Sequence, residues 1–287
     1  MTLDINSAFD DLPISPVGSV VAADFYEAFL KCEELAGSLP KNLLGQDASF
    51  AFYRMLQDVH STRTTNTEFF RRKSDASEAL TTLWLSRVRL TAQMFIAMND
   101  VPEYRPLTSD DLLNFAKLSV RTESLPEIAA TLFSLGVILI YERSLPRMKL
   151  DGAVFRLAGN RPVIALSLRY PRLDHYWFTL MHELAHVVLH LDRLDVPILD
   201  DLDERKDDIV ERQADRLASN SLISRSDWRS SICMYDQSES AVIKFAAQVG
   251  IHPSIVAGRM RRELSRYDIF SKIVNEVDVR KVLLGDE

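Results

Sequence analysis

The chain has 287 residues and a formal net charge of −7 at pH 7, from 34 basic and 41 acidic residues. Its hydrophobic content of 47% and charged content of 26% are ordinary for a soluble globular protein, and its length predicts two domains. The acidic balance excludes a global attraction to nucleic acid or anionic membranes. Two cysteines exclude a disulfide framework and a cysteine-based zinc site.

The amino-terminal segment and the apolar runs predict where the protein is located. "MTLDINSAFDDLP" is acidic and has no basic segment followed by an apolar core, so we do not interpret it as a signal peptide. The longest apolar-rich run, residues 132–141, is too short to span a bilayer. We therefore expect a cytoplasmic protein without membrane contact.

Residues 1–105 are predicted to form a helical region whose role the sequence does not define. Residues 1–20 carry prolines, a glycine and several acids, and indicate a loose arm. Apolar residues then recur at helical spacing in three stretches, residues 21–35, 50–60 and 76–98.

Residues 106–287 are predicted to form a second domain of the α+β class. Thr108 or Ser109 can cap one helix, and Pro126 can start another. Strands are then expected over residues 137–142, 153–157 and 163–168, with Gly159 and Asn160 as a hairpin turn. The predicted fold is mostly helical, with a small antiparallel sheet of about three strands packed on the helix described next.

Residues 178–191 are mostly apolar and lack proline and glycine, which predicts a helix. Within it His182, Glu183 and His186 form the pattern His-Glu-x-x-His. Four helical residues advance about 6 Å and return to nearly the same face, so both imidazoles can reach one zinc ion. Glu183 can accept a proton from a metal-bound water, as a general base does. Asp174 can cap this helix.

A catalytic zinc site needs a third protein ligand, and two candidates follow. Residues 209–223 have helical spacing and carry Glu211 and Asp215 on one face. They offer a carboxylate ligand and an acceptor for the second N–H of a ligand histidine. The rival ligand is His190, but an unbroken helix carries it one turn beyond His186 and the metal. We therefore expect Glu211 to bind zinc, and His190 to support the site.

The C-terminal segment predicts a short helix, a turn at Gly250 and a second helix from Pro253, an arrangement similar to a helix-turn-helix. Residues 241–267 carry one acid and five cations, Lys244, Arg259, Arg261, Arg262 and Arg266. These basic helices are a candidate DNA contact, although a basic helix face is often only solvated. Residues 192–208 hold eight acids against three bases, and we interpret them as a solvated loop.

The two motifs together resemble those of the gluzincin class of zinc peptidases, and the wider pattern resembles the ImmA/IrrE family of bacterial metallopeptidases. The similarity runs from about Glu127 to Arg262 and includes "GAVFRLAGNRPVIALSL", "WFTLMHELAHVVLH", "ERQADRLASNSLIS" and "AAQVGIHPSIVAGRM". Family members typically have Glu-x-x-Ala-Asn on the third-ligand helix, whereas this chain has Asp215 at the last position. The resemblance implies that the C-terminal segment is part of the peptidase body.

The resemblance also implies a zinc-dependent endopeptidase that cleaves a helix-turn-helix transcriptional repressor in phage, mobile-element, defence or DNA-damage control. On this hypothesis one Zn²⁺ per chain is held by His182, His186 and Glu211, and Glu183 is the catalytic base. An oxyanion-side donor is also needed, for which the unranked candidates are Tyr170, His175 and Tyr176.

Control of such a protease and two rival functions are further hypotheses. A thiolate could take the water position and keep the enzyme idle, which makes Cys233 or Cys32 a candidate inhibitory thiol, although a small buried hydrophobe is the ordinary role of each. The rivals are a non-catalytic regulator with a structural zinc site that binds DNA or a repressor, and an antitoxin-like binding module. Glu183 disfavours the first, because a structural site has no use for a base. The sequence does not predict an oligomeric state.

Overall fold

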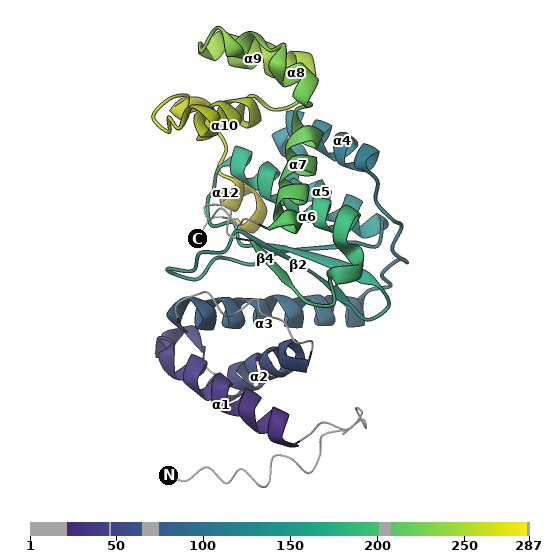
Figure 1. Cartoon of the computed structure of the whole chain (residues 1–287), viewed down its shortest axis with the longest axis vertical. Coiled ribbons are helices and arrows are strands. Elements are labelled where there is room, and N and C mark those ends of the chain that lie inside the picture. The colour runs from purple at the N-terminus through teal and green to yellow at the C-terminus, as the bar shows by residue number, and fades with distance from the viewer. Residues whose placement is uncertain (1–21, 46, 65–74, 201–207, 286–287) are drawn as a thin grey trace.

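The computed structural model describes residues 22–45, 47–64, 75–200 and 208–285. The chain forms three layers: helices from its first part, a mixed sheet, and helices from its second part (Figure 1). The arm predicted over residues 1–20 lies outside the described residues.

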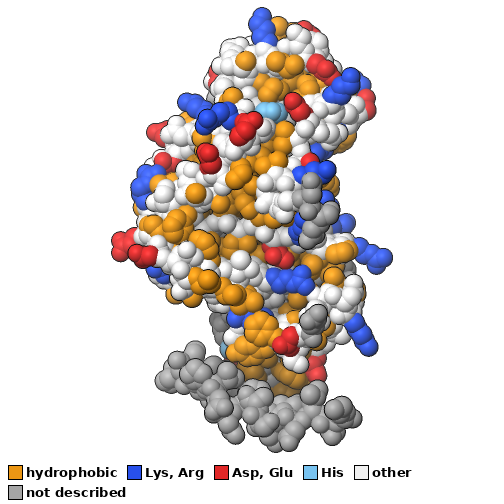
Figure 2. Space-filling model, turned by 180° about the vertical axis from the view of Figure 1, so that it is seen from behind, with side chains coloured by type: hydrophobic (Ala, Val, Ile, Leu, Met, Phe, Trp, Pro, Cys, Tyr) orange, Lys and Arg blue, Asp and Glu red, His pale blue; other side chains and the backbone are white. Residues whose placement is uncertain are grey.

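The first layer consists of α1 (Ala22–Ser38), α2 (Ala48–Thr64) and α3 (Asp75–Met98), which agree with the helices predicted in this half of the chain. Figure 2 shows hydrophobic side chains exposed at this end of the molecule. The buried side chains of the layer form one hydrophobic core with a face of the sheet, to which Trp84 and Phe155 both belong. The layer therefore packs directly on the sheet, and a domain boundary near residue 105 stays a prediction.

The sheet has the strand order β1-β3-β2-β4. β1 (Ile138–Tyr141) runs parallel to β3 (Arg161–Leu166), whereas β2 (Gly152–Leu157) runs antiparallel to both β3 and β4 (Ile198–Asp200). The prediction of about three antiparallel strands is therefore wrong in two respects, because four strands form a mixed sheet. The fourth strand, β4, lies within the acidic run 192–208, which the sequence analysis interpreted as a solvated loop because of its charges.

The parallel pair arises from the order in which the chain visits the strands. After β1, the connection 142–151 carries the chain past the place of β3 to β2, and the hairpin then returns β3 beside β1. β3 therefore runs in the same direction as β1. Strand propensity gives no information on the pairing partner, so the sequence alone did not reveal this arrangement.

The hairpin turn between β2 and β3 lies where it was predicted. Gly159 and Asn160 have φ values of 79° and 57°. Both values are positive, as a type I′ turn requires, and glycine and asparagine adopt that conformation more readily than other residues. The turn sets a register that pairs Gly152 with Leu166 and Val154 with Ile164.

The opposite face of the sheet is covered by α6 (Leu173–His190), which packs against α7 (Ile209–Leu222). α4 (Ser109–Lys117) and α5 (Leu125–Ser134) complete this layer (Figure 1). Thr108 caps α4, because its side chain accepts from the N–H of Asp111 and the Asp111 carboxylate accepts from the N–H of Thr108. The sequence offered Thr108 or Ser109 as the N-cap of this helix, and Thr108 is the N-cap residue.

The predicted cap of α6 is wrong. The N-cap residue is Arg172, and Asp174 lies inside the first turn. The Arg172 guanidinium donates two hydrogen bonds to the Asp174 carboxylate, each 2.9 Å long. This cation competes with the helix N–H groups for the carboxylate, although the negative charge still stabilises the first turn.

The C-terminal helices are α8 (Arg225–Arg229), α9 (Glu239–Val249), α10 (Pro253–Leu264), α11 (Ser271–Val274) and α12 (Val279–Leu284). α9 ends at Gly250, whose φ is 78°. The angle between α9 and α10 is 120°, within the range of a helix-turn-helix. Within the described part of the chain, no single helix is long and apolar enough to cross a bilayer, and α9 and α10 pass that test only as a bent pair.

α10 approaches α6 closely at Gly258. A Cβ atom there would lie 2.3 Å from Oδ2 and 2.8 Å from Cβ of Asp174, a side chain that Arg172 holds in place. We expect Gly258→Ala to destabilise the fold by about 1–3 kcal/mol, as overpacked sites do. Urea unfolding measures the change. Gly37→Ala is the control, since a Cβ there meets nothing within 4 Å; equal midpoints for both variants would contradict the packing argument.

Candidate metal centre

Four side chains with metal-binding atoms converge beside the sheet. His182 and His186 come from α6, Asp200 ends β4, and Glu211 lies in the first turn of α7. One donor atom from each residue lies within 4.8 Å of all the others. The two imidazoles and Asp200 are at most 1% exposed, so the donor atoms lie inside the protein.

The donor atoms have the spacing of a coordination shell. His182 Nε2 lies 3.1 Å from His186 Nε2 and 3.4 Å from Glu211 Oε2. Asp200 Oδ2 lies 3.5 Å from His182 Nε2 and 3.7 Å from His186 Nε2. Ligands at about 2.0–2.1 Å around a tetrahedral ion lie roughly 3.3 Å from one another. The side chains present therefore fit a divalent ion such as zinc.

Hydrogen bonds on the far side of each imidazole fix the direction of its lone pair. His182 Nδ1 lies 3.0 Å from Asp215 Oδ1, and a carboxylate can only accept, so His182 carries its proton on Nδ1. His190 Nε2 lies 3.0 Å from the amide oxygen of Gln213, which also accepts. His190 Nδ1 is then an acceptor for the Nδ1–H of His186, 3.1 Å away.

When both imidazoles are neutral, each Nε2 therefore carries a lone pair, and the two Nε2 atoms face each other across 3.1 Å. Two lone pairs at that distance repel unless a cation lies beside both of them. A neutral imidazole with a bare Nε2 is also the form that binds metal. This arrangement is the strongest observation in favour of a metal ion at this point.

The charges around His182 also favour a cation. Burial alone would lower its pKa, but the Asp200 carboxylate and hydrogen bonds with Asp215 and Glu211 raise the pKa well above its ordinary value. The surroundings therefore stabilise positive charge at the imidazole. A divalent ion would balance the two carboxylates of the donor group.

Glu183 lies beside this group, fully buried. A Cβ atom on Gly152 would lie 2.0 Å from Glu183 Oε1, so the carboxylate packs directly against the first residue of β2. Gly152 also pairs with Asp200. Only glycine leaves room for a carboxylate at that place, and sequence reasoning gave Gly152 no role.

Asp200 is the donor that sequence reasoning missed. It was counted among the acids of a solvated loop, yet it is only 1% exposed. The available signal was weak: Val196, Ile198 and Leu199 interrupt the charges just before Asp200, and Pro197 precedes the strand. Residues 201–207 of the same run lie outside the described part of the chain.

Two of the candidate oxyanion donors lie together. The rings of Tyr170 and His175 make an edge contact at 4.6 Å, and His175 Nε2 lies 3.1 Å from Asp151 Oδ1. The N–H of Asp151 donates to the carbonyl of Asp200 at 2.7 Å, so this pair lies along the same sheet edge as the donor group. Both side chains remain candidates.

Tyr176 does not join them. It is 2% exposed, and its hydroxyl lies 2.9 Å from the hydroxyl of Tyr141. Burial and the neighbouring Tyr141 raise the pKa of Tyr176 well above its ordinary value. The structure therefore places this phenol in the core between α6 and β1.

Neither cysteine belongs to the donor group. Cys32 is buried in the core of the first layer, where burial and the nearby Glu33 raise the pKa of its thiol to about 12. Cys233 lies in a short turn after α8, buried in the core around α9. The structure thus gives both thiols the ordinary role of small buried hydrophobes.

Four of the five C-terminal cations have partners within the protein. Arg259 lies over the Trp228 ring at 4.3 Å, and Arg262 over the Phe178 ring at 4.7 Å. The other two, Arg261 and Arg266, bond to Tyr267 and Asp268. Among the described residues, only two of these cations pair with acids, Arg259 with Glu263 at 3.0 Å and Arg266 with Asp268 at 2.8 Å, and a DNA contact stays a prediction.

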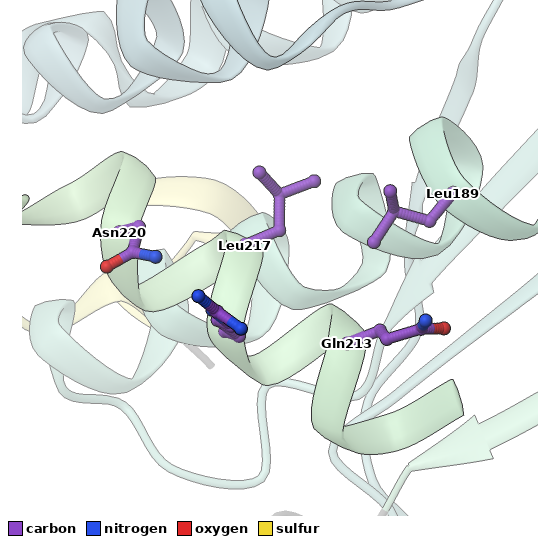
Figure 3. Close-up of a pocket in the computed structure, with 5 residues that line it drawn as sticks. Leu189, Gln213, Leu217 and Asn220 are labelled. Carbon is purple, nitrogen blue, oxygen red and sulfur yellow. The ribbon is translucent and has the colours of Figure 1, made fainter. Parts of the chain in front are cut away.

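A hollow of about 300 Å³ lies outside the metal centre, lined by Leu189, Gln213, Arg216, Leu217 and Asn220 (Figure 3). It contains none of the four donors. Its wall nevertheless includes Gln213, which accepts from His190. Contact with the metal centre is therefore indirect, through His190 and His186.

The fold and donor group together have the features of a peptidase-type metal centre: a His-Glu-x-x-His helix under a sheet and a carboxylate from the next long helix. Residues 136–261 match the IrrE N-terminal-like domain, which is a peptidase family. The match contains the whole sheet, α6, α7 and all four donors. This match supports an ImmA/IrrE-family protein. No curated protein matches the chain significantly.

The hydrogen bond between Asp215 and His182 gives a test of the metal centre. We expect Asp215→Ala to lower metal affinity about 10- to 100-fold, because the imidazole loses the partner that sets its tautomer and orientation. Competition with a chromophoric chelator measures the affinity. Asp192→Ala, which removes an exposed acid of similar size, should leave it unchanged. Equal affinities for Asp215→Ala and Asp192→Ala would contradict the assigned tautomer.

Proposed function

We propose that the protein is a zinc-dependent endopeptidase that cleaves a helix-turn-helix transcriptional repressor. The observation that carries the proposal is the convergence of His182 Nε2 and His186 Nε2 with carboxylate donors, next to the buried Glu183 of the same helix. A metal site with a carboxylate base next to it is the requirement for metal-assisted hydrolysis. When bound, zinc supplies a Lewis acid that polarises the scissile carbonyl and acidifies a water molecule.

The chain's own residues have distinct roles in this proposal. His182, His186 and Glu211 hold the metal, and Asp215 and His190 orient the two imidazoles. Glu183 accepts the proton of the attacking water at a carboxylate oxygen and returns it to the leaving amine. Its closeness to Gly152 puts this base at the edge of β2.

Tyr170 supplies a hydrogen-bond donor on the oxyanion side, and the His175 ring in contact with it positions it. His175 is seven residues before His182 on α6, which is roughly 10.5 Å along the same helix face. Asp151 accepts from its Nε2–H and holds the ring at the sheet edge. The Tyr170 hydroxyl is then the donor on that side.

The substrate class comes from the family resemblance, and the charge of the chain is compatible with it. A net charge of −7 favours association with basic partners, and DNA-binding repressors present basic surfaces. Cleavage would relieve repression in phage, mobile-element, defence or DNA-damage control. In this proposal the protein acts in a stress response in the cytoplasm, where its repressor substrate binds DNA.

Incubation with helix-turn-helix repressors from the source organism tests the proposal. We expect two fragments whose masses sum to the repressor plus one water, and loss of both fragments when a chelator removes the metal. Mass spectrometry identifies the cleaved bond. A repressor that stays intact both with the zinc-loaded protein and with its Asp200→Ala variant would contradict the proposed function.

A second candidate function is a non-catalytic regulator with a structural metal. One observation favours it: the group has four protein donors, which is the usual number in structural sites, whereas catalytic sites have three. The two candidate functions therefore differ in one property of Asp200: it is a permanent ligand in a closed structural site, but it can leave the metal in a catalytic site that is blocked.

A further inference from the structure

Asp200 lies where a catalytic site needs its open position. A hydrolytic zinc site has three protein ligands and leaves the fourth position for water. Here Asp200 Oδ2 is within 3.7 Å of both histidine Nε2 atoms, at the same range as Glu211 Oε2 from His182. A metal ion held by His182, His186 and Glu211 would therefore also contact Asp200.

The strand that carries Asp200 lies along an edge of the sheet that a substrate would use. β4 pairs antiparallel with β2, with Gly152 opposite Asp200 and Val154 opposite Ile198. Arg156 N–H extends the contact by donating to the carbonyl of Leu194 at 2.6 Å. Peptides commonly bind as an added strand on such an edge. β4 thus covers the outer edge of the strand that packs against Glu183.

The donor atoms are closed to a peptide in this conformation. Glu183 and His186 are 0% exposed and His182 is 1% exposed. Among the four donors, the Glu211 side chain is the most exposed at 12%. A scissile carbonyl needs access to both the metal and Glu183, so a substrate can bind only after the segment that ends in Asp200 has moved.

We propose that the chain inhibits its own metal centre: Asp200 is a fourth metal ligand in the position of the catalytic water, and β4 occupies the edge of β2 at which a substrate strand binds. This inference rests on the proposed peptidase function. The protein is latent in this conformation, and withdrawal of Asp200 opens the site to water and to substrate.

A carboxylate is chemically suited to a reversible block. It binds zinc through one oxygen and can leave without any redox step, so activation requires only that another strand or ligand displaces it. β4 is three residues long, which limits the hydrogen bonds that hold it to β2. Asp200 thereby takes the inhibitory role for which Cys233 and Cys32 were only candidates.

The test uses the full-length protein with Co²⁺ in place of zinc, because the visible spectrum of Co²⁺ reports its ligands. Acetohydroxamate is the probe, since it binds a metal with an open position. We expect Asp200→Ala to bind it with an affinity about tenfold or more above that of the unsubstituted protein, in which only a minor open form can bind. The Asp200→Asn variant keeps the side-chain shape, so it repeats the test if Asp200→Ala fails to fold. Asp192→Asn makes the same change at an exposed position and is the matched control.

Cleavage of the repressor is the second readout. We expect both Asp200 variants to cleave faster than the unsubstituted protein, and Asp192→Asn to cleave at the unsubstituted rate. Equal hydroxamate affinity in the unsubstituted protein and the Asp200 variants would overturn the proposal, because the fourth position would already be open. Loss of Co²⁺ from both folded Asp200 variants would also overturn it, since Asp200 would then be a necessary structural ligand.

The two proposals fail in distinguishable ways. If the Asp200 variants gain hydroxamate binding but no variant cleaves the repressor, Asp200 is the fourth ligand and the peptidase function is wrong. If the unsubstituted protein cleaves the repressor as fast as the Asp200 variants and binds hydroxamate equally well, the peptidase function stands and the self-inhibition is wrong.

Discussion

Glu183→Gln should lower the rate of repressor cleavage about 100-fold or more while leaving the bound metal in place. The glutamine amide has the same shape as the carboxylate but cannot accept a proton from water. It also keeps the contact with Gly152, where even one added atom would meet the side chain at 2.0 Å. Metal content by mass spectrometry and kcat/KM on the purified repressor separate the loss of the base from the loss of the metal.

Glu183→Gln is best compared with its parent when both proteins also carry Asp200→Ala, because the blocked form then no longer limits the rate of cleavage. Glu127→Gln is the matched control, because Glu127 is an exposed helical glutamate on α5. It should cleave at the parent rate. Activity of Glu183→Gln within a few-fold of the parent would mean that this carboxylate is not the base, and the hydrolytic role of the His-Glu-x-x-His motif would be lost with it.

Removal of a metal ligand should have an effect of similar size on metal affinity. His186→Ala and Glu211→Ala each delete one donor, and we expect affinity to fall on the order of 100-fold or more, since a zinc site is worth roughly 10–16 kcal/mol shared among its ligands. His190→Ala should retain the metal with weaker affinity, because His190 bonds to a ligand without joining the donor group.

Chelator competition gives the affinities, and the rise of the unfolding temperature with added zinc gives an independent measure, because a ligand that binds only the folded state stabilises it. Arg216→Ala, on the exposed face of α7, is the control, and its zinc affinity should equal that of the unsubstituted protein. Full occupancy in Glu211→Ala together with an empty site in His190→Ala would make His190 the third ligand.

The parts of the site that could be predicted are those set by local geometry. The four-residue spacing of His182 and His186 on a helix fixes their relative position whatever else the chain does. The same holds for Glu211 and Asp215 on α7, and for the turn at Gly159 and Asn160, where two adjacent residues must have positive φ.

The parts that could not be predicted depend on contacts between distant segments. Asp200 becomes a candidate ligand only because β4 pairs with β2, and Gly152 acquires a role only because Glu183 packs against it. An acidic run gives no sign of which of its members is buried. The same reason explains the cap of α6, where a competing contact from Arg172 to Asp174 has no local signature.

The most direct test of the metal centre is anomalous diffraction at the zinc edge from crystals of the zinc-loaded protein. We predict one strong peak per chain at about 2.0–2.2 Å from Nε2 of both His182 and His186 and from a carboxylate oxygen of Glu211. In the latent form Asp200 should complete the shell. A zinc ion bound through His190 or Cys233 without Glu211, or no peak at this position in protein that carries zinc, would contradict the account.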